Sequence, residues 1–299
     1  MKHGDLRRNR FFIQERNRRN SGFGLMLEQT RLFIGSPFFS GIMFICAAVV
    51  VLTGNEIIGV PVFICIMSLL LFISRDTAPT MLPFMLMCMF VTKCYDSFDT
   101  FIKLAPMAVI PIAALIFHFV RYRGKFSVGP SFSGVCAAAA AVALGGAFSI
   151  SSSEYFSPTS LYYVFGLGAG MVLLYLILRY AYVGKRDEGY DPVLRFAATM
   201  YIAGLFGVFM VASHYAMNFS DIIQAEKTEI QWSNNISTML MFAMPFPFYF
   251  AVKGNPLHVF SGLAIYIAAF ATGSRGGILM GAIELLLCVI YFFASSRRL

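Results

Sequence analysis

The chain has 299 residues, of which 58% are hydrophobic and 13% are charged, and its mean hydropathy is +0.72. Soluble domains carry about 25% charged residues and at most about half apolar ones. This balance excludes an ordinary soluble protein and predicts an integral membrane protein. The formal net charge of +8 does not indicate a nucleic-acid partner, because much of it gathers in residues 1–36.

Residues 1–36 are predicted to form a basic cytoplasmic tail. No apolar run directly follows the cationic cluster, so the segment does not have the pattern of a cleavable signal peptide. Cations next to a membrane-spanning segment favour contact with anionic membrane lipids. The cluster consists of Lys2, Arg7, Arg8, Arg10, Arg16, Arg18, Arg19 and Arg31.

Residues 37–299 are predicted to form one all-α, polytopic transmembrane domain with about ten spanning helices. Crossing a hydrocarbon core of about 30 Å takes roughly 20 apolar residues in a helix. The apolar runs are 37–52, 57–73, 78–92, 104–120, 132–149, 158–178, 196–216, 236–252, 257–272 and 276–294.

The distribution of cations between these runs predicts the orientation of the chain. Cytoplasmic loops of membrane proteins carry an excess of Lys and Arg. With the N-terminus inside, 19 of the 23 Lys and Arg residues fall on the cytoplasmic side and 4 on the outer side. Both termini are therefore expected in the cytoplasm of a multi-pass protein of the cell (inner) membrane.

The turn Thr272-Gly273-Ser274-Arg275-Gly276-Gly277 is predicted to lie on the outer face. Glycines let a ligand approach the backbone closely, and Ser274 is able to cap the following helix. A helix N-terminus beside a guanidinium group is suited to binding phosphate. Arg275 is therefore a candidate catalytic residue, with Ser274, Gly276 and Gly277 as candidate binding residues. The alternative is an Arg side chain that reaches the membrane surface from a glycine turn.

The longest outer segment, residues 217–235, is predicted to include a short helix along the membrane. Trp232 fits the aromatic belt at the membrane surface, and Asn234 and Asn235 are positioned to cap the next helix. Trp and Asn side chains also bind sugars, so these three residues are candidate substrate-binding residues. The apolar face of the short helix consists of Phe219, Ile222, Ile223 and Ile230.

Two titratable residues complete the candidate set. His214 is the only histidine expected near the face of Arg275, so it is the candidate base; the alternative is a structural hydrogen bond. Glu284 is expected about two turns into the last span, where an acid usually faces the bundle interior. It is a candidate for orienting a polar network beneath Arg275 or for carrying a proton. No motif with metal-ligand spacing occurs, and neither a metal nor a cofactor is expected.

The order of these features resembles the O-antigen ligase and O-antigen polymerase superfamily. The stretch Trp232–Asn235 corresponds to a Trp-x-x-Asn motif before a helix that contains Pro245 and Pro247, and Ser274-Arg275-Gly276 corresponds to a Ser-Arg-Gly motif. The resemblance extends over about residues 195–294. It implies a polytopic glycosyltransferase that uses polyprenyl-pyrophosphate-linked glycans at the outer face, with the arginine on the donor pyrophosphate.

The resemblance also implies a segment beyond Leu299. Family members continue with a large outer loop, whose histidine activates the acceptor hydroxyl, and about two further spans. The chain is therefore interpreted as the front part of such an enzyme, as one of two polypeptides that form it, or as a truncated non-catalytic remnant.

The predicted function is a membrane glycan polymerase or ligase in cell-surface polysaccharide synthesis. It would transfer a glycan from polyprenyl pyrophosphate to a sugar hydroxyl of a lipid-linked or glycan acceptor. The alternative is a lipid-linked glycan flippase or another transporter, which would need polar groups at the middle of the membrane.

Overall fold

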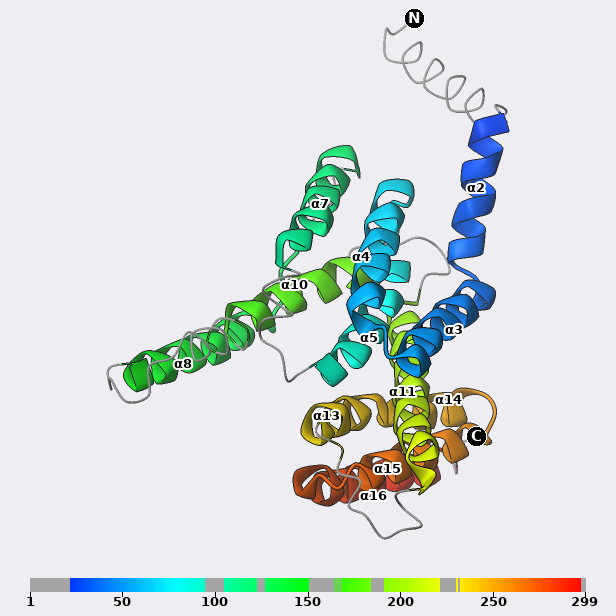
Figure 1. The fold of residues 1–299 in the computed structure, drawn as a ribbon, viewed down its shortest axis with the longest axis vertical. Coiled ribbons are helices and arrows are strands. Elements are labelled where there is room, and N and C mark those ends of the chain that lie inside the picture. The colour runs from blue at the N-terminus through cyan, green and yellow to red at the C-terminus, as the bar shows by residue number, and fades with distance from the viewer. Residues whose placement is uncertain are drawn as a thin grey trace, which may run out of the picture.

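The computed structural model describes residues 22–94, 105–122, 127–150, 168–183, 191–220 and 232–296, together with residues 164, 166 and 230 (Figure 1). All regular structure in these segments is helical, and they contain no strand, which confirms the all-α prediction for this part of the chain. The long helices are α2 (Gly22–Ile34), α3 (Pro37–Thr53), α4 (Glu56–Ile73), α5 (Ala78–Val91), α7 (Val109–Tyr122), α8 (Phe132–Ile150), α10 (Ala169–Val183), α11 (Pro192–Met217), α13 (Ser233–Ala243), α14 (Pro245–Lys253), α15 (His258–Ala271) and α16 (Arg275–Ser296). Two short 3₁₀ turns, η1 (Thr92–Cys94) and η2 (Ala105–Ala108), complete the set.

Four stretches among these segments are long and apolar enough to cross a membrane. They are Glu56–Ile73, Pro192–Met217, Ser233–Lys253 and Arg275–Ser295. A fifth candidate is the bent pair Glu28–Ile34 and Pro37–Thr53, whose two parts meet at 62°. Helices α5 and α15 are apolar but have 14 residues each, which at about 1.5 Å per residue is short of a 30 Å core. The chain is thus a helical protein with several candidate membrane spans.

The helix starts follow from local sequence signals. Ser36 precedes α3, and its side chain accepts a hydrogen bond from the Phe39 N–H at 3.3 Å. Asp191 precedes α11 and accepts from the N–H groups of Val193 and Leu194 at 2.9 and 3.1 Å. Proline follows each cap, where its fixed φ suits the first helical turn and its missing N–H costs nothing.

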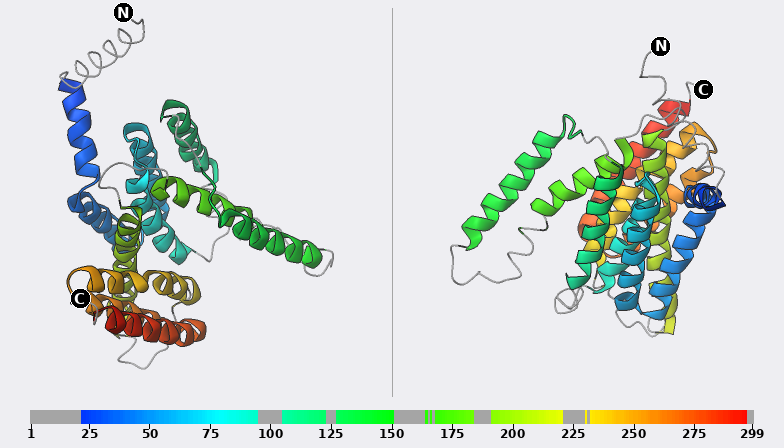
Figure 2. Two further views of the ribbon diagram at one scale, coloured as in Figure 1. Left: turned by 180° about the vertical axis from the view of Figure 1, so that it is seen from behind. Right: turned by 90° about the horizontal axis from the view of Figure 1, so that it is seen from above.

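Helix α11 is the central packing element of the fold. It contacts α3, α5, α10, α13, α14 and α15, and in Figure 1 it passes behind α3 toward the α13–α16 group. Gly207 lets the neighbouring helices approach closely, because a Cβ atom there would lie 2.7 Å from Leu240 and 2.8 Å from Met89. By contrast, α8 packs on α10 and extends away from the other helices (Figures 1 and 2).

Hydrogen bonds define two opposite ends of the bundle. Near the start of α11, Arg195 pairs with Asp76 at 2.8 Å and the Tyr201 hydroxyl lies 2.8 Å from His258 Nδ1. Near the end of α11, the Tyr215 hydroxyl donates to the Ala271 carbonyl. Helices α5, α11 and α15 therefore run in the same direction. We call the two ends the Lys253 end and the His214 end, after the residues that α14 and α11 place there.

The last carbonyl groups of α4, at the Lys253 end, bind side chains from two other helices. His118 Nδ1 lies 3.0 Å from the Leu71 oxygen, and the Tyr122 hydroxyl donates to the Phe72 oxygen at 3.1 Å. Arg31 of α2 donates to the Ile73 oxygen at 3.3 Å. A helix C-terminus leaves carbonyls without backbone partners and favours positive charge. These contacts attach α2 and α7 to the bundle.

Candidate functional site

The predicted Ser-Arg-Gly turn forms a capped entry to α16. Gly273 has φ of +75°, a conformation that glycine adopts without steric cost. Thr272 Oγ1 accepts from the Ser274 N–H at 3.3 Å, and Ser274 Oγ accepts from the Gly277 N–H, also at 3.3 Å. The second bond is the helix cap that the sequence predicts for Ser274. The turn is therefore held by its own short polar side chains.

A hydrogen bond joins this turn to the start of α13, 40 residues earlier in the chain. Ser274 Oγ donates to Asn234 Oδ1 at 2.9 Å. Ser274 is 6% exposed, whereas Asn234 lies at the surface. The structure thus places the Trp-x-x-Asn stretch and the Ser-Arg-Gly turn side by side.

Close packing of α16 on α13 supports this contact. A Cβ atom at Gly277 would lie 2.8 Å from Ser237 Cβ and 2.9 Å from Ser237 Oγ. Ser237 is itself buried and donates to the Asn234 carbonyl at 3.0 Å. Gly277 therefore serves helix packing, while Gly276 is exposed and has no atom within 4 Å of the corresponding position. Of the two glycines, Gly276 is the one with space for a ligand.

The helix cap predicted for the two asparagines is wrong. Helix α13 begins at Ser233, its N-cap residue is Trp232, and no side chain makes the capping bond. Asn234 and Asn235 lie inside the first turn and are both exposed. The Asn234 side chain binds Ser274 instead, because the turn before α16 reaches the same end of the bundle.

Arg275 is the first residue of α16 and is exposed. Among the described residues it has no hydrogen-bond or ion-pair partner. The first N–H groups of a helix also lack backbone partners, and Ser274 takes up only one of them. An exposed guanidinium group, free N–H groups and the positive end of the helix dipole therefore coincide. This arrangement is able to bind an anion.

His214 lies on the last turns of α11 at the same end. Its ring is 6.0 Å from the Trp232 ring, at an interplanar angle of 86°. The Nε2 atom is buried and has no hydrogen-bond partner among the described residues. His214 and Trp232 thus join the end of α11 to the start of α13, next to the Ser274–Asn234 contact.

Trp232 is more deeply buried than an aromatic-belt position implies. Its side chain is 7% exposed and belongs to the main hydrophobic core, which also includes Ile230 and Ile236. The indole packs against His214, so its clearest role in the structure is to position that ring. The predicted short helix before it falls mainly on residues 221–229, which lie outside the described residues.

Sequence patterns alone did not single out an ion pair at this end. Lys93 Nζ lies 2.8 Å from a Glu56 carboxylate oxygen and donates to the Val51 carbonyl at 3.3 Å. In the sequence, Glu56 and Lys93 each flank a different apolar run. That pattern does not indicate that the two residues pair with each other.

Glu284 does not join the polar group around Arg275. It lies nine residues further along α16, roughly 13 Å along the helix axis. It lines a separate cavity with residues of α11 and α14. Glu284 therefore lies within the last helix, as the sequence predicts, but not beneath Arg275 in a shared polar network.

Comparisons with known proteins add no further assignment. The chain matches no family model, no curated protein and no solved structure. In the described segments, no three His, Cys, Asp or Glu side chains lie close enough together to hold a metal ion. The geometry at the His214 end therefore carries the functional argument.

A double-mutant cycle tests the contact between the two motifs. We expect Ser274→Ala to lower the free energy of unfolding by about 1 kcal/mol, since it removes the helix cap and the bond to Asn234. Asn234→Ala removes only the second bond. If the bond is present in the membrane, the two substitutions together should cost less than the sum of their separate effects, by roughly 0.5–1 kcal/mol. Unfolding of the purified protein in detergent measures all three variants, and strict additivity would contradict the contact.

Proposed function

We propose that the chain is a membrane glycan polymerase or ligase, or a part of one. It transfers a glycan from polyprenyl pyrophosphate to a sugar hydroxyl at the outer membrane face. The observation that carries the proposal is the Ser274–Asn234 hydrogen bond at 2.9 Å. It brings together the two short motifs on which the family resemblance rests, and Arg275 follows directly as an exposed cation.

In this proposal Arg275 binds the pyrophosphate of the donor. Guanidinium binds phosphate through two parallel hydrogen bonds, and the start of α16 adds N–H groups and a partial positive charge. As the bond between the anomeric carbon and the phosphate oxygen breaks, negative charge grows on the leaving pyrophosphate. A fixed cation stabilises that charge more in the transition state than in the ground state. Ser274 holds the turn through its bonds to Asn234 and Gly277, and Gly276 leaves room for the phosphate.

His214 is the candidate base among the described residues. Where this chain acts without the further outer loop that the resemblance implies, the acceptor hydroxyl gives its proton to the His214 imidazole while its oxygen forms the new bond to the anomeric carbon. The absence of a competing partner for Nε2 among these residues supports this role. Trp232 orients the imidazole, and the exposed Asn235 is a candidate contact for the sugar.

The proposal includes ten spans, both termini in the cytoplasm and location in the inner membrane. Its support is the distribution of cations over the described helices. The Lys253 end carries Arg31, Arg75, Arg121, Arg179, Arg195 and Lys253, while the His214 end carries Lys93 and Arg275. The positive-inside rule then directs the Lys253 end toward the cytoplasm and the candidate site outward.

A deletion experiment distinguishes transfer from transport. If the protein is a transferase, cells without it should accumulate the lipid-linked donor on the outer leaflet, since delivery continues and consumption stops. Leaflet-specific labelling of the glycan in intact and lysed spheroplasts measures this. Accumulation on the inner leaflet would contradict the proposal and favour a flippase.

A further inference from the structure

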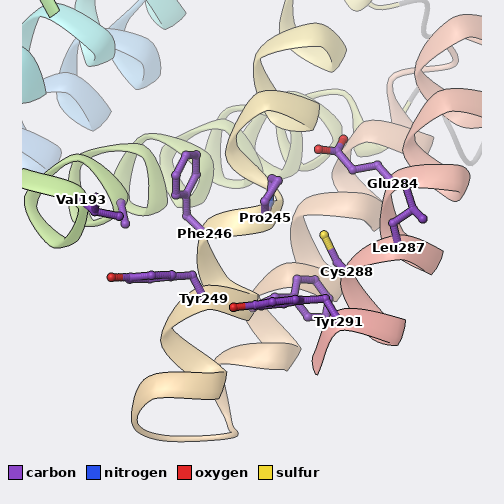
Figure 3. Close-up of a pocket in the computed structure, with 10 residues that line it drawn as sticks. Val193, Pro245, Phe246, Tyr249, Glu284, Leu287, Cys288 and Tyr291 are labelled. Atoms are coloured by element: carbon purple, nitrogen blue, oxygen red, sulfur yellow. The ribbon is translucent and has the colours of Figure 1, made fainter. Parts of the chain in front are cut away.

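A cavity of about 420 Å³ lies between α11, α14 and α16 (Figure 3). Apolar side chains dominate its wall. Val193 and Ala197 come from α11, Pro245, Phe246 and Phe248 from α14, and Leu287 and Cys288 from α16. The volume and lining suit a hydrocarbon chain better than a water-soluble metabolite.

The polar groups of the cavity are placed at its two ends. Tyr249 and Tyr291 extend in the same direction with their hydroxyl groups on the same side (Figure 3). The Tyr249 oxygen is buried and has no hydrogen-bond partner among the described residues. The exposed ammonium group of Lys253 lies 4.7 Å from the centre of the Tyr249 ring. One end of the cavity therefore carries a cation and hydroxyl donors.

Glu284 lies at the other end, away from the turn that follows α14. It is seven residues before Tyr291 on α16, which corresponds to roughly 10 Å along the helix. A carboxyl group next to hydrocarbon is least costly when protonated. None of the residues that line that end of the cavity carries a positive charge, so it offers no charge partner to an anionic group. The Lys253 end of the cavity therefore suits the anionic headgroup of a bound amphiphile, and the Glu284 end suits its hydrocarbon tail.

We propose that this cavity binds one anionic phospholipid from the leaflet at the Lys253 end. The phosphate contacts Lys253 and accepts a hydrogen bond from Tyr249, and an acyl chain runs along the apolar wall toward Glu284. Lys253 is the last residue of α14, so it lies where the headgroups of that leaflet are expected. A soluble anion would leave the apolar wall uncovered, and a zwitterionic lipid would gain less from the cation. The site is separate from Arg275 and does not depend on the proposed transferase activity.

Native mass spectrometry of the purified full-length protein tests the site. Phosphatidylglycerol and phosphatidylcholine with identical acyl chains serve as probes. We expect one phosphatidylglycerol to bind saturably and with higher affinity than phosphatidylcholine. Lys253→Gln should weaken phosphatidylglycerol binding by roughly fivefold or more, the effect of one cation at a membrane surface. Leu287→Trp should block binding by filling the cavity.

Two control variants match these substitutions. Arg121→Gln is the control for Lys253→Gln, because Arg121 is also a cation beside an aromatic ring, 5.7 Å from the centre of the Phe117 ring. Arg121 belongs to α7, which does not line the cavity. Leu69→Trp adds the same bulk on α4, where Leu69 is 57% exposed compared with 60% for Leu287. Neither control should change binding. Equal affinity for the two lipids, no effect of Lys253→Gln, or equal loss in the controls would overturn the proposal. So would competition by inorganic phosphate alone, which would indicate a soluble anion.

Discussion

Replacing Arg275 with alanine is expected to reduce glycan transfer by a factor on the order of 10²–10³. That is the usual effect of removing one fixed group that stabilises transition-state charge. The side chain is exposed and has no partner among the described residues, so its loss should leave the fold intact. Arg275→Lys should retain intermediate activity, because an ammonium group keeps the charge but loses the paired geometry. The measurement is the length and amount of glycan formed by membranes containing the complete enzyme and a polyprenyl-pyrophosphate donor.

The control for this prediction is Arg121→Ala. Arg121 is also exposed and cationic, but it lies on α7 at the Lys253 end. Its loss should not affect transfer. Wild-type glycan length and transfer rate in Arg275→Ala would remove the basis of the proposed donor site.

Gly277→Ala is expected to cause the largest loss of stability among single-methyl additions at the site. The new Cβ atom would lie 2.8 Å from Ser237 Cβ, and Ser237 is 1% exposed, so it cannot move into solvent. Forcing such a group into a packed interface costs about 1–3 kcal/mol. Helices α13 and α16 would separate, and with them Asn234 and Arg275. Transfer should therefore fall together with the melting temperature in detergent.

The neighbouring glycine supplies a matched control. Gly276→Ala adds the same methyl group where no atom lies within 4 Å, so its melting temperature should be unchanged or slightly higher. Combining Gly277→Ala with Ser237→Gly removes the clash and should restore part of the lost stability. Equal melting temperatures for the Gly276 and Gly277 variants would show that the α13–α16 contact is looser than described.

The sequence predicted the helical class and most helix positions because long apolar runs and capping residues are local signals. Ser274 caps α16 as its side chain predicts, and the structure shows the same kind of cap at Ser36 and Asp191. The number of full-length spans was less predictable. The apolar runs at 78–92 and 257–272 were counted as spans, but the helices they form, α5 and α15, have only 14 residues each. A run of apolar residues does not show where its helix ends.

The contacts of the site depended on tertiary structure. A serine and an asparagine 40 residues apart carry no sequence signal that they will form a hydrogen bond. A single Trp before a helix resembles an interfacial anchor until the position of α11 is known, and here α11 places His214 against it. The last apolar run placed Glu284 about two turns into its helix, but it did not indicate which neighbouring helices Glu284 faces, so the cavity was not predicted.

Site-directed thiol labelling determines whether the Ser274–Gly276 turn is an outward-facing donor site. In a cysteine-free background, Gly276→Cys and Asn255→Cys place one thiol at each end of the bundle, both at exposed positions. We expect a membrane-impermeant maleimide to label position 276 in right-side-out vesicles, and polyprenyl-pyrophosphate-linked glycan to slow this labelling. Position 255 should react only after permeabilisation and without protection by the donor. Labelling of position 255 but not of position 276 in intact vesicles, or labelling of position 276 that the donor does not slow, would show that this turn is not an outward-facing donor site.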